Sequence, residues 1–343
     1  MDSITQIALG ATIGEAGWRR RLGGRAVVWG GFCGLVPDLD IALGAFDPWA
    51  DLQYHRSFSH SLLLLPLAAL AFGKLGHLFG KRRGDWRAWA HLSFWALITH
   101  PLLDLFTSYG TQLLWPLSDR RYAWDGVSII DPVYTLPLFV VLGLALKRTQ
   151  PPPRWRTRFA AGVLALTTAY LALGTWSMTR ARDRARASLR AEGLGGARLR
   201  ALPTFFNNQS FRLVAEVEEG DFRIGYLSLL APAPIEWVVV RSAEGPDIDA
   251  ALASERGRLF EWFSDGYLLA RRGDAPDVVE LVDLRFGTVL SPTASVFGAR
   301  VELEGGEVRR VKRLGRPEMD VGAELDALGA LLFDGRVQRP RSP

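Results

Sequence analysis

Residues 26–46 read AVVWGGFCGLVPDLDIALGAF, and this stretch decides how the first half of the chain is organised. The run is apolar and long enough to cross a bilayer, because about 20 residues of helix span the hydrocarbon core. Two carboxylates, Asp38 and Asp40, nevertheless interrupt it directly after Pro37. A carboxylate inside a membrane segment costs about 2.5–3.5 kcal/mol to insert, so it is rarely without a function. The stretch therefore predicts a membrane helix that breaks where its backbone lines a polar cavity.

More apolar stretches follow this one. They lie at about 61–79, 89–106, 132–146 and 159–178, and a shorter one at 3–14 precedes them all. Tryptophans flank several of these runs, as in the aromatic belts at membrane interfaces. We therefore expect residues 1–180 to form an α-helical membrane bundle of about five spans plus a short N-terminal helix.

Basic residues gather at 19–25, 81–87 and 147–158, each time beside an apolar stretch. Threading five spans in order places all three clusters on one side, which the positive-inside rule assigns to the cytoplasm. The C-terminal half then lies outside the cytoplasm. Arginines between 180 and 190 oppose this rule, and we interpret them as part of a juxtamembrane helix. Because topology accounts for the net charge of +5, we expect no nucleic-acid partner.

The residues after 180 have the charge density of a soluble domain. Alternating apolar residues predict two strands at 211–217 and 222–230, joined as a hairpin across 218–221. The same patterns predict further strands at 235–241, 266–271, 278–284, 296–303 and 307–312, and helices at 248–263 and 318–333. We expect a small α+β domain over residues 181–336 and a disordered tail over residues 337–343.

Histidines and aspartates of the membrane half occur in short motifs. His55 and His60 belong to HRSFSH at 55–60, and His100 and Asp104 belong to HPLLD at 100–104. The i, i+4 spacing of His100 and Asp104 puts both side chains on one face of a helix. In the five-span topology these motifs and PDLD all fall at one membrane face. We therefore expect a metal site with these ligand candidates: Asp38, Asp40, His55, His60, His100 and Asp104.

The candidate ligands combine imidazole nitrogen with carboxylate oxygen. Such a mixed set suits Zn²⁺, with Mn²⁺ or Fe²⁺ as alternatives, better than Ca²⁺ or Mg²⁺, which prefer oxygen alone. Asp38 or Asp40 could instead supply the catalytic base. The only cysteine is Cys33, so a cysteine-based zinc site and a disulfide within the chain are excluded.

Each residue also has a structural interpretation that the sequence leaves open. Asp38 and Asp40 could cap a helix near the interface, and His55 and His60 could be surface imidazoles. His100 could be a hydrogen-bonded core histidine. Arg56 could form an ion pair with an aspartate such as Asp104, or hold an anionic substrate group such as phosphate. Only the joint occurrence of these residues at one face favours a metal site.

The membrane half also contains the acidic or imidazole side chains Asp119, Asp131, His77 and His91. Asp119 and Asp131 also fall at the predicted outer face and are weaker candidates. His77 and His91 lie toward the basic loops, so we do not expect them to bind the metal. No internal repeat is evident, which makes a transporter with an ion pathway the least favoured of the function classes.

The motifs together resemble the YdjM-like family of inner-membrane, metal-dependent hydrolases. The resembling stretches are MDSITQ at 1–6 with Gly10, PDLD at 37–40, HRSFSH at 55–60 and HPLLD at 100–104, and in the C-terminal half Pro203-Thr204, Asn207, WFSDGY at 262–267 and DLRFG at 283–287. Many shorter relatives carry a histidine where this chain has Gln6. The resemblance implies an inner-membrane location and hydrolase activity, and a more distant likeness to zinc-dependent phospholipase C enzymes points to phosphoester bonds.

These observations lead to two hypotheses of different classes. The first is a membrane-bound metal-dependent hydrolase acting on a phosphoester or lipid at the outer face of the inner membrane. In that case membrane lipid or a small molecule is the partner, and Asp38, Asp40 and Arg56 are the catalytic candidates. The alternative is a non-enzymatic membrane protein with a structural metal site and an outer domain that binds partners. The sequence leaves the substrate and the oligomeric state open.

Overall fold

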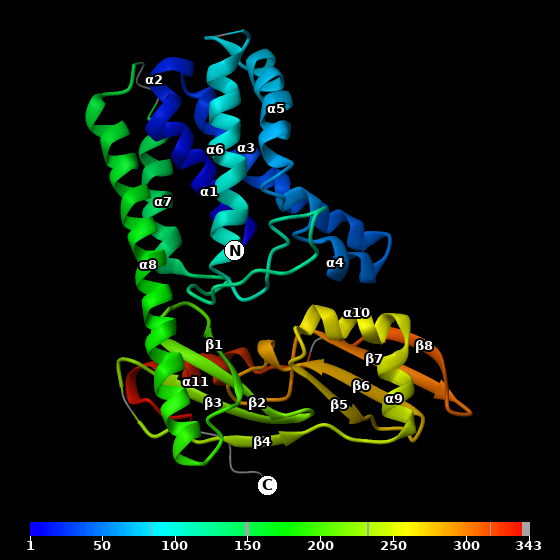
Figure 1. The fold of residues 1–343 in the computed structure, drawn as a ribbon. Helices are drawn as coiled ribbons and strands as arrows, with labels where there is room; N and C mark the ends of the chain where they lie inside the picture. The colour runs from blue at the N-terminus through cyan, green and yellow to red at the C-terminus, as the bar shows by residue number, and fades with distance from the viewer. Residues whose placement is uncertain (83, 148–150, 232, 316, 338–343) are drawn as a thin grey trace. The chain divides into compact units, whose positions relative to one another are not determined.

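The computed structural model describes residues 1–82, 84–147, 151–231, 233–315 and 317–337. Arg83 and Arg148, from two of the basic clusters, and tail residues 338–343 lie outside the described residues. The chain divides into two compact units (Figure 1). Unit 1 contains Met1–Thr175 and Phe205–Asn207, and unit 2 contains Trp176–Thr204 and Asn208–Pro343. The division falls within one long helix.

Unit 1 is a bundle of helices (Figure 1). Its helices are α1 (Ser3–Ile13), α2 (Arg19–Leu22), α3 (Arg25–Leu35), α4 (Pro48–Tyr54), α5 (Leu65–Phe79), α6 (Trp86–Leu105), α7 (Pro132–Ala145) and the first part of α8 (Arg154–Ala191). A π-helical turn, Gly14–Trp18, follows α1, and 3₁₀ segments cover Val36–Ala45 and Phe58–His60. Helix α3 passes directly into the first 3₁₀ segment at Pro37, which cannot donate an intrahelical hydrogen bond.

Glycines allow α1 and α3 to cross at very short distance. A side chain on Gly10 would collide with the backbone of Gly30, and one on Gly34 would collide with the backbone of Gln6. Small residues at such crossings let helix backbones approach closely in membranes. Both helices also pack against α6. The crossing therefore holds the start of α1, the end of α3 and the polar end of α6 together.

The expectation of about five membrane spans is wrong. By length and composition, two helical stretches of the described residues can cross a membrane: Arg25–Ala45 and Arg154–Ala191. A third span results only if the bent pair Pro48–His60 and Leu65–Phe79 counts as one. The other predicted spans fail for two reasons. Helix α7 has 14 residues, fewer than the roughly 17–25 needed, and α6 carries polar groups such as His91, His100 and Asp104.

Unit 2 has a larger β portion than a small α+β domain suggests, with two four-stranded antiparallel sheets. The first sheet has the order β1 (Arg198–Pro203), β2 (Ser210–Glu218), β3 (Asp221–Ser228) and β4 (Val238–Arg241). The second has the order β5 (Leu268–Arg272), β6 (Val278–Asp283), β7 (Gly298–Glu304) and β8 (Glu307–Arg313). Helices α9 (Pro246–Ala253), α10 (Glu255–Ser264) and α11 (Val321–Asp334) complete the unit. Both sheets are meanders, in which each strand pairs with the next along the chain.

The sequence patterns located most elements of unit 2. The predicted hairpin is confirmed, since Glu218 pairs with Asp221 across the turn. The helix predicted over 248–263 is two helices, because Ser254 ends α9 and its hydroxyl caps α10 by accepting a hydrogen bond from Gly257 N. The arginine-rich helix after residue 180 is confirmed as the end of α8. It buries Ala181, Ala185 and Leu189 against the first sheet. Arg180, Arg186 and Arg190 are exposed, whereas Arg184 is half-buried and donates to the carbonyl oxygen of Ser228.

Candidate metal centre

Four side chains of unit 1 meet at one buried point. They are Asp38 on the 3₁₀ segment after α3, His60 at the end of the second 3₁₀ segment, and His100 and Asp104 one turn apart on α6. Each contributes a ligand atom, and these atoms lie within 4.8 Å of one another. His60, His100 and Asp104 are fully buried, and Asp38 is 6% exposed.

Four of the six separations among these atoms are close to those expected around a single metal ion. His60 Nε2 lies 3.1 Å from Asp104 Oδ2 and 3.8 Å from Asp38 Oδ1. His100 Nε2 lies 3.5 Å from Asp104 Oδ2 and 3.2 Å from Asp38 Oδ1. Donor atoms arranged tetrahedrally around Zn²⁺ at bond lengths near 2.0–2.1 Å are about 3.3–3.4 Å apart. The four measured separations lie on both sides of that value.

The other nitrogen of His100 indicates which form of its ring faces this point. His100 Nδ1 lies 2.6 Å from the carbonyl oxygen of Gly34, so Nδ1 carries the proton and donates it. In the neutral ring, Nε2 then presents a lone pair toward Asp38 Oδ1. Two acceptors at 3.2 Å repel each other unless a cation or a proton lies between them. Metal-binding histidines are typically oriented by such a second hydrogen bond.

His60 is oriented by a chain of hydrogen bonds that ends at Asp40. Ser59 Oγ donates to Asp40, and His60 Nδ1 lies 2.9 Å from Ser59 Oγ. Because Ser59 donates its hydroxyl proton to Asp40, His60 Nδ1 is the donor to Ser59. In the neutral ring, His60 Nε2 then presents a lone pair. Within the described part of the chain, neither His60 Nε2 nor Asp104 Oδ2 has a hydrogen-bond partner. Buried polar atoms without partners are rare in proteins, and here two of them face each other.

Asp40 and His55 lie beside the four-residue cluster rather than in it. His55 Nδ1 is 2.7 Å from Asp40 Oδ1, and the backbone N–H of Arg56 donates to Asp40 Oδ2 at 3.0 Å. Asp40 also lies 3.5 Å from His60 Nδ1. With its oxygens occupied by these groups, Asp40 orients the two histidines. The side chain of His55 is 13% exposed.

Arg56 supplies a buried positive charge next to the cluster. Its guanidinium lies 3.1 Å from Asp104 Oδ1 and donates to Thr107 Oγ1 at 2.8 Å. The residue has a φ of +64°, in the left-handed region that costs a non-glycine residue free energy. That conformation brings its N–H to Asp40 while its side chain reaches Asp104.

The two oxygens of Asp104 have different roles. Oδ1 accepts hydrogen bonds from the amide of Gln6 at 3.1 Å and from the α-amine of Met1, in addition to its ion pair with Arg56. Oδ2 faces the two histidines. Oδ1 is thus saturated by the protein, and Oδ2 is left for the centre of the cluster.

Comparison with known proteins places the cluster in a family. The model of the YdjM inner membrane proteins matches residues 1–181, which is more than half of the chain. The chain belongs to this family. The matched region contains the four clustered residues and Asp40, His55 and Arg56. The family match supports a membrane location, and the structure adds a buried group of side chains that could hold a metal ion.

One relative of this chain is "Uncharacterized protein YfhP" from Bacillus subtilis (strain 168). The two are 27% identical over 100 residues, which cover 28% of this chain and 29% of YfhP. The chain thus matches less than a third of the length of that relative. No solved structure matches this chain.

Several contacts of the candidate metal centre come from residues outside the six ligand candidates. Ser3 Oγ donates to Asp38 Oδ2 at 2.6 Å, and Thr107 and Ser59 hold Arg56 and Asp40. Gln6 contacts both Asp104 and the carbonyl oxygen of His100, and its Oε1 is buried without a partner among the described residues. The resemblance already singled out position 6, where this chain has Gln6 in place of a histidine. The structure places Gln6 beside the four clustered residues.

Asp119 and Asp131 are placed away from this cluster. Asp131 caps α7 by accepting hydrogen bonds from Val133 N and Tyr134 N, and it also accepts one from the Tyr170 hydroxyl. Asp119 is exposed in the loop before α7. Neither belongs to the group of side chains that could hold a metal.

Proposed function

We propose that this protein is a membrane-bound hydrolase that uses one divalent metal ion, most suitably Zn²⁺, to cleave a phosphoester or lipid substrate. The observation that carries the proposal is the convergence of buried nitrogen and oxygen atoms from Asp38, His60, His100 and Asp104, two of them without a hydrogen-bond partner among the described residues, beside the guanidinium of Arg56. Two imidazole nitrogens and two carboxylate oxygens are a donor set that zinc accepts, and Mn²⁺ and Fe²⁺ accept it too.

Each residue would have a distinct task. Asp38, His60, His100 and Asp104 would hold the ion, which when bound would lower the pKa of a coordinated water and polarise the scissile bond. Arg56 would offset negative charge on a phosphate, which its planar guanidinium suits. His55, the partly exposed member of the Asp40–His55 pair, would exchange a proton with solvent while Asp40 fixes its Nδ1.

Metal analysis of the detergent-purified protein tests the proposal. The wild type is expected to carry about one equivalent of metal and to hydrolyse at least one member of a panel of phosphomonoesters, phosphodiesters and phospholipids. His60→Ala and Asp104→Ala are expected to lose both metal and turnover. Asp119→Ala, which changes an exposed acid outside the cluster, is the matched control and should keep both. A wild type without stoichiometric metal would sink the proposal.

The burial of the cluster favours a second candidate function, a structural metal site in a non-enzymatic membrane protein. Three of the four residues are fully buried, and closed four-ligand sites are typical of structural zinc. Stoichiometric metal in a wild-type protein that turns over none of the panel would favour this alternative. Exchange of bound metal separates the two further, because a substrate-accessible site should release its ion to a chelator faster than a closed one.

We further propose a multi-pass topology with the metal centre on the extracytoplasmic side of the inner membrane. The basic residues and the candidate metal centre lie at opposite ends of the helices of unit 1. Gln6 of α1 contacts Asp104 at the centre, and Arg19, 13 residues later, contacts the carbonyl oxygen of Ala145 at the end of α7. That separation is about 20 Å along a helix. The arginine end would face the cytoplasm by the positive-inside rule. The C-terminal domain is proposed to be extracytoplasmic.

Cysteine labelling of intact cells tests this orientation. Asp119→Cys should react with a membrane-impermeant maleimide added outside, whereas Arg87→Cys should react only after the membrane is opened. Both positions are exposed, and the native Cys33 is buried. The reverse labelling pattern would overturn the orientation and leave the metal proposal untouched.

A further inference from the structure

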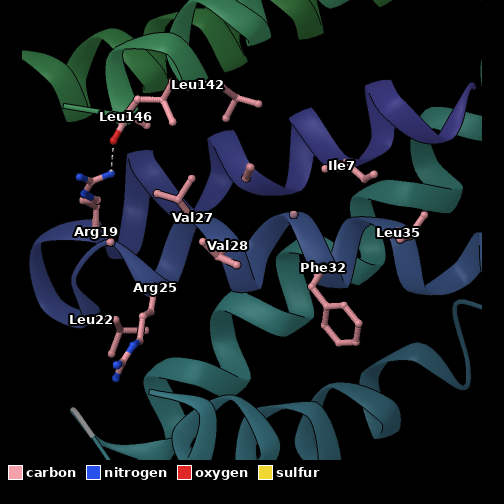
Figure 2. A pocket seen from close by; sticks show the side chains of 14 residues that line it. Ile7, Arg19, Leu22, Arg25, Val27, Val28, Phe32, Leu35, Leu142 and Leu146 are labelled. Carbon is pink, nitrogen blue, oxygen red and sulfur yellow. Dashed lines mark hydrogen bonds between the residues drawn. The ribbon is translucent and has the colours of Figure 1, made fainter. Parts of the chain in front are cut away.

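An apolar groove of about 1210 Å³ lies on unit 1 between α1, α3 and α7 (Figure 2). Its walls include Ile7, Val28, Phe32 and Leu142. Val28 is 63% exposed and Phe32 is 44% exposed, so these side chains border open space. The close crossing of α1 and α3 keeps the floor shallow, since a side chain on Gly31 would contact Ala11 and Ile7.

One end of this groove is positively charged. Figure 2 shows Arg19 and Arg25 at that end, with Ile7 and Leu35 toward the other. Arg19 is buried and already engaged, because it pairs with Glu15 and donates to the carbonyl oxygen of Ala145. Arg25 is exposed, and it has no ion pair or hydrogen bond to any described side chain. The groove is thus apolar along most of its length, and the guanidinium of Arg25 at one end is available to a ligand.

The length of the groove matches one leaflet of a membrane. From Arg25 to Leu35 the wall follows ten residues of α3, or about 15 Å at the rise of an α-helix. Half of the roughly 30 Å hydrocarbon core has the same thickness. An acyl chain along α3 would therefore place its headgroup at Arg25.

We propose that the groove is a binding site for an anionic phospholipid, with an acyl chain along Val28 and Phe32 and the headgroup phosphate at Arg25. The chemistry is complementary at both ends, because the groove is apolar where the chain lies and cationic where the phosphate lies. The site is separate from the candidate metal centre, and nothing in the proposal depends on the metal or on hydrolysis.

Native mass spectrometry of the detergent-purified full chain tests the proposal with phosphatidylglycerol and phosphatidylcholine of identical acyl chains. The wild type is expected to retain one phosphatidylglycerol in preference to phosphatidylcholine. Arg25→Gln should reduce that preference about fivefold, the effect of one basic residue at an anionic lipid surface. Val28→Trp changes an exposed side chain, should not disturb folding, and should reduce the binding of both lipids by filling the groove.

Arg87→Gln is the matched control, since Arg87 is an exposed arginine outside the groove. It should leave the lipid preference unchanged. An equal loss in Arg87→Gln and Arg25→Gln would mean that general surface charge attracts the lipid, and it would overturn the proposal. Undiminished lipid retention in Val28→Trp would also overturn it. So would a wild-type dimer that binds no lipid and that Val28→Trp dissociates, because a second copy of the chain would then occupy the groove.

Discussion

Asp104 in unit 1 and Asp283 in unit 2 are both completely buried aspartates that contact an arginine, yet their surroundings differ. Both oxygens of Asp283 accept hydrogen bonds from Arg285, through Nε and through Nη2, and Oδ1 accepts another from the backbone N–H of Arg285. Asp104 places only Oδ1 against Arg56, and its Oδ2 is without a hydrogen-bond partner in the described part of the chain.

The difference separates a structural ion pair from a candidate binding site. Arg285 also donates to the carbonyl oxygen of Phe263, so this pair in unit 2 is closed on itself and on the backbone. A buried carboxylate oxygen that faces two imidazole nitrogens is stable only if something positive lies between them. Burial alone therefore does not mark a site, whereas burial with converging lone pairs does.

Asp104→Asn should have the largest effect on metal binding. The substitution keeps the shape of the side chain but weakens the ligand oxygen, so metal affinity should fall by more than the roughly 100-fold that an orienting contact costs. Isothermal titration of the apo protein with Zn²⁺ measures the change. Asp283→Asn is the matched control, and equal metal affinity in Asp104→Asn and wild type would contradict the assignment of Asp104 as a ligand.

Asp283→Asn should instead destabilise unit 2. It leaves the guanidinium of Arg285 buried without a counter-charge, which costs about 3–5 kcal/mol. Thermal unfolding of the full chain, followed by the far-ultraviolet signal of the strands, should show an earlier transition with unchanged metal content. An unaltered transition would mean that the backbone contact to Phe263 suffices to hold Arg285.

Asp40→Asn should have a smaller effect on the metal. Asp40 touches His55 and the Ser59–His60 chain but lies outside the four-residue cluster, so removing its charge should weaken metal binding by about 10–100-fold. The same titration measures it, with Asp51→Asn on the neighbouring helix α4 as the control. A loss as large as that of Asp104→Asn would make Asp40 a direct ligand.

The sequence predicted which motifs meet in space better than it predicted the membrane helices around them. The i, i+4 spacing of His100 and Asp104 requires only a helix, and α6 supplies one. The meeting of Asp38 with His60 depends on the 3₁₀ segments that carry them and on the glycine crossing of α1 and α3, which no local pattern encodes. Apolar content overcounted spans, because α5 and α7 are apolar but short.

The distinction between a proposed ligand and a proposed orienting residue also could not come from spacing. Asp38 and Asp40 are two residues apart on one segment, yet Asp38 faces His100 and Asp40 faces His55. In a 3₁₀ segment, residues two apart point in different directions, because there are about three residues per turn. The 3₁₀ geometry after Pro37 therefore turns the two carboxylates toward different histidine nitrogens: Asp38 toward Nε2 of His100 and His60, and Asp40 toward Nδ1 of His55 and His60.

Gln6→His should have the smallest effect, and in the direction of tighter binding. Gln6 already contacts Asp104 from α1, and its unpartnered Oε1 shows that the amide is imperfectly accommodated there. An imidazole at this position would add a fifth donor and raise metal affinity several-fold, with a Co²⁺ absorption spectrum that shifts from four to five coordination. Gln6→Leu is the matched control, because it removes the amide without adding a donor. Tighter binding in both variants would trace the gain to loss of the amide, and weaker binding in both would make Gln6 a positioning residue for Asp104.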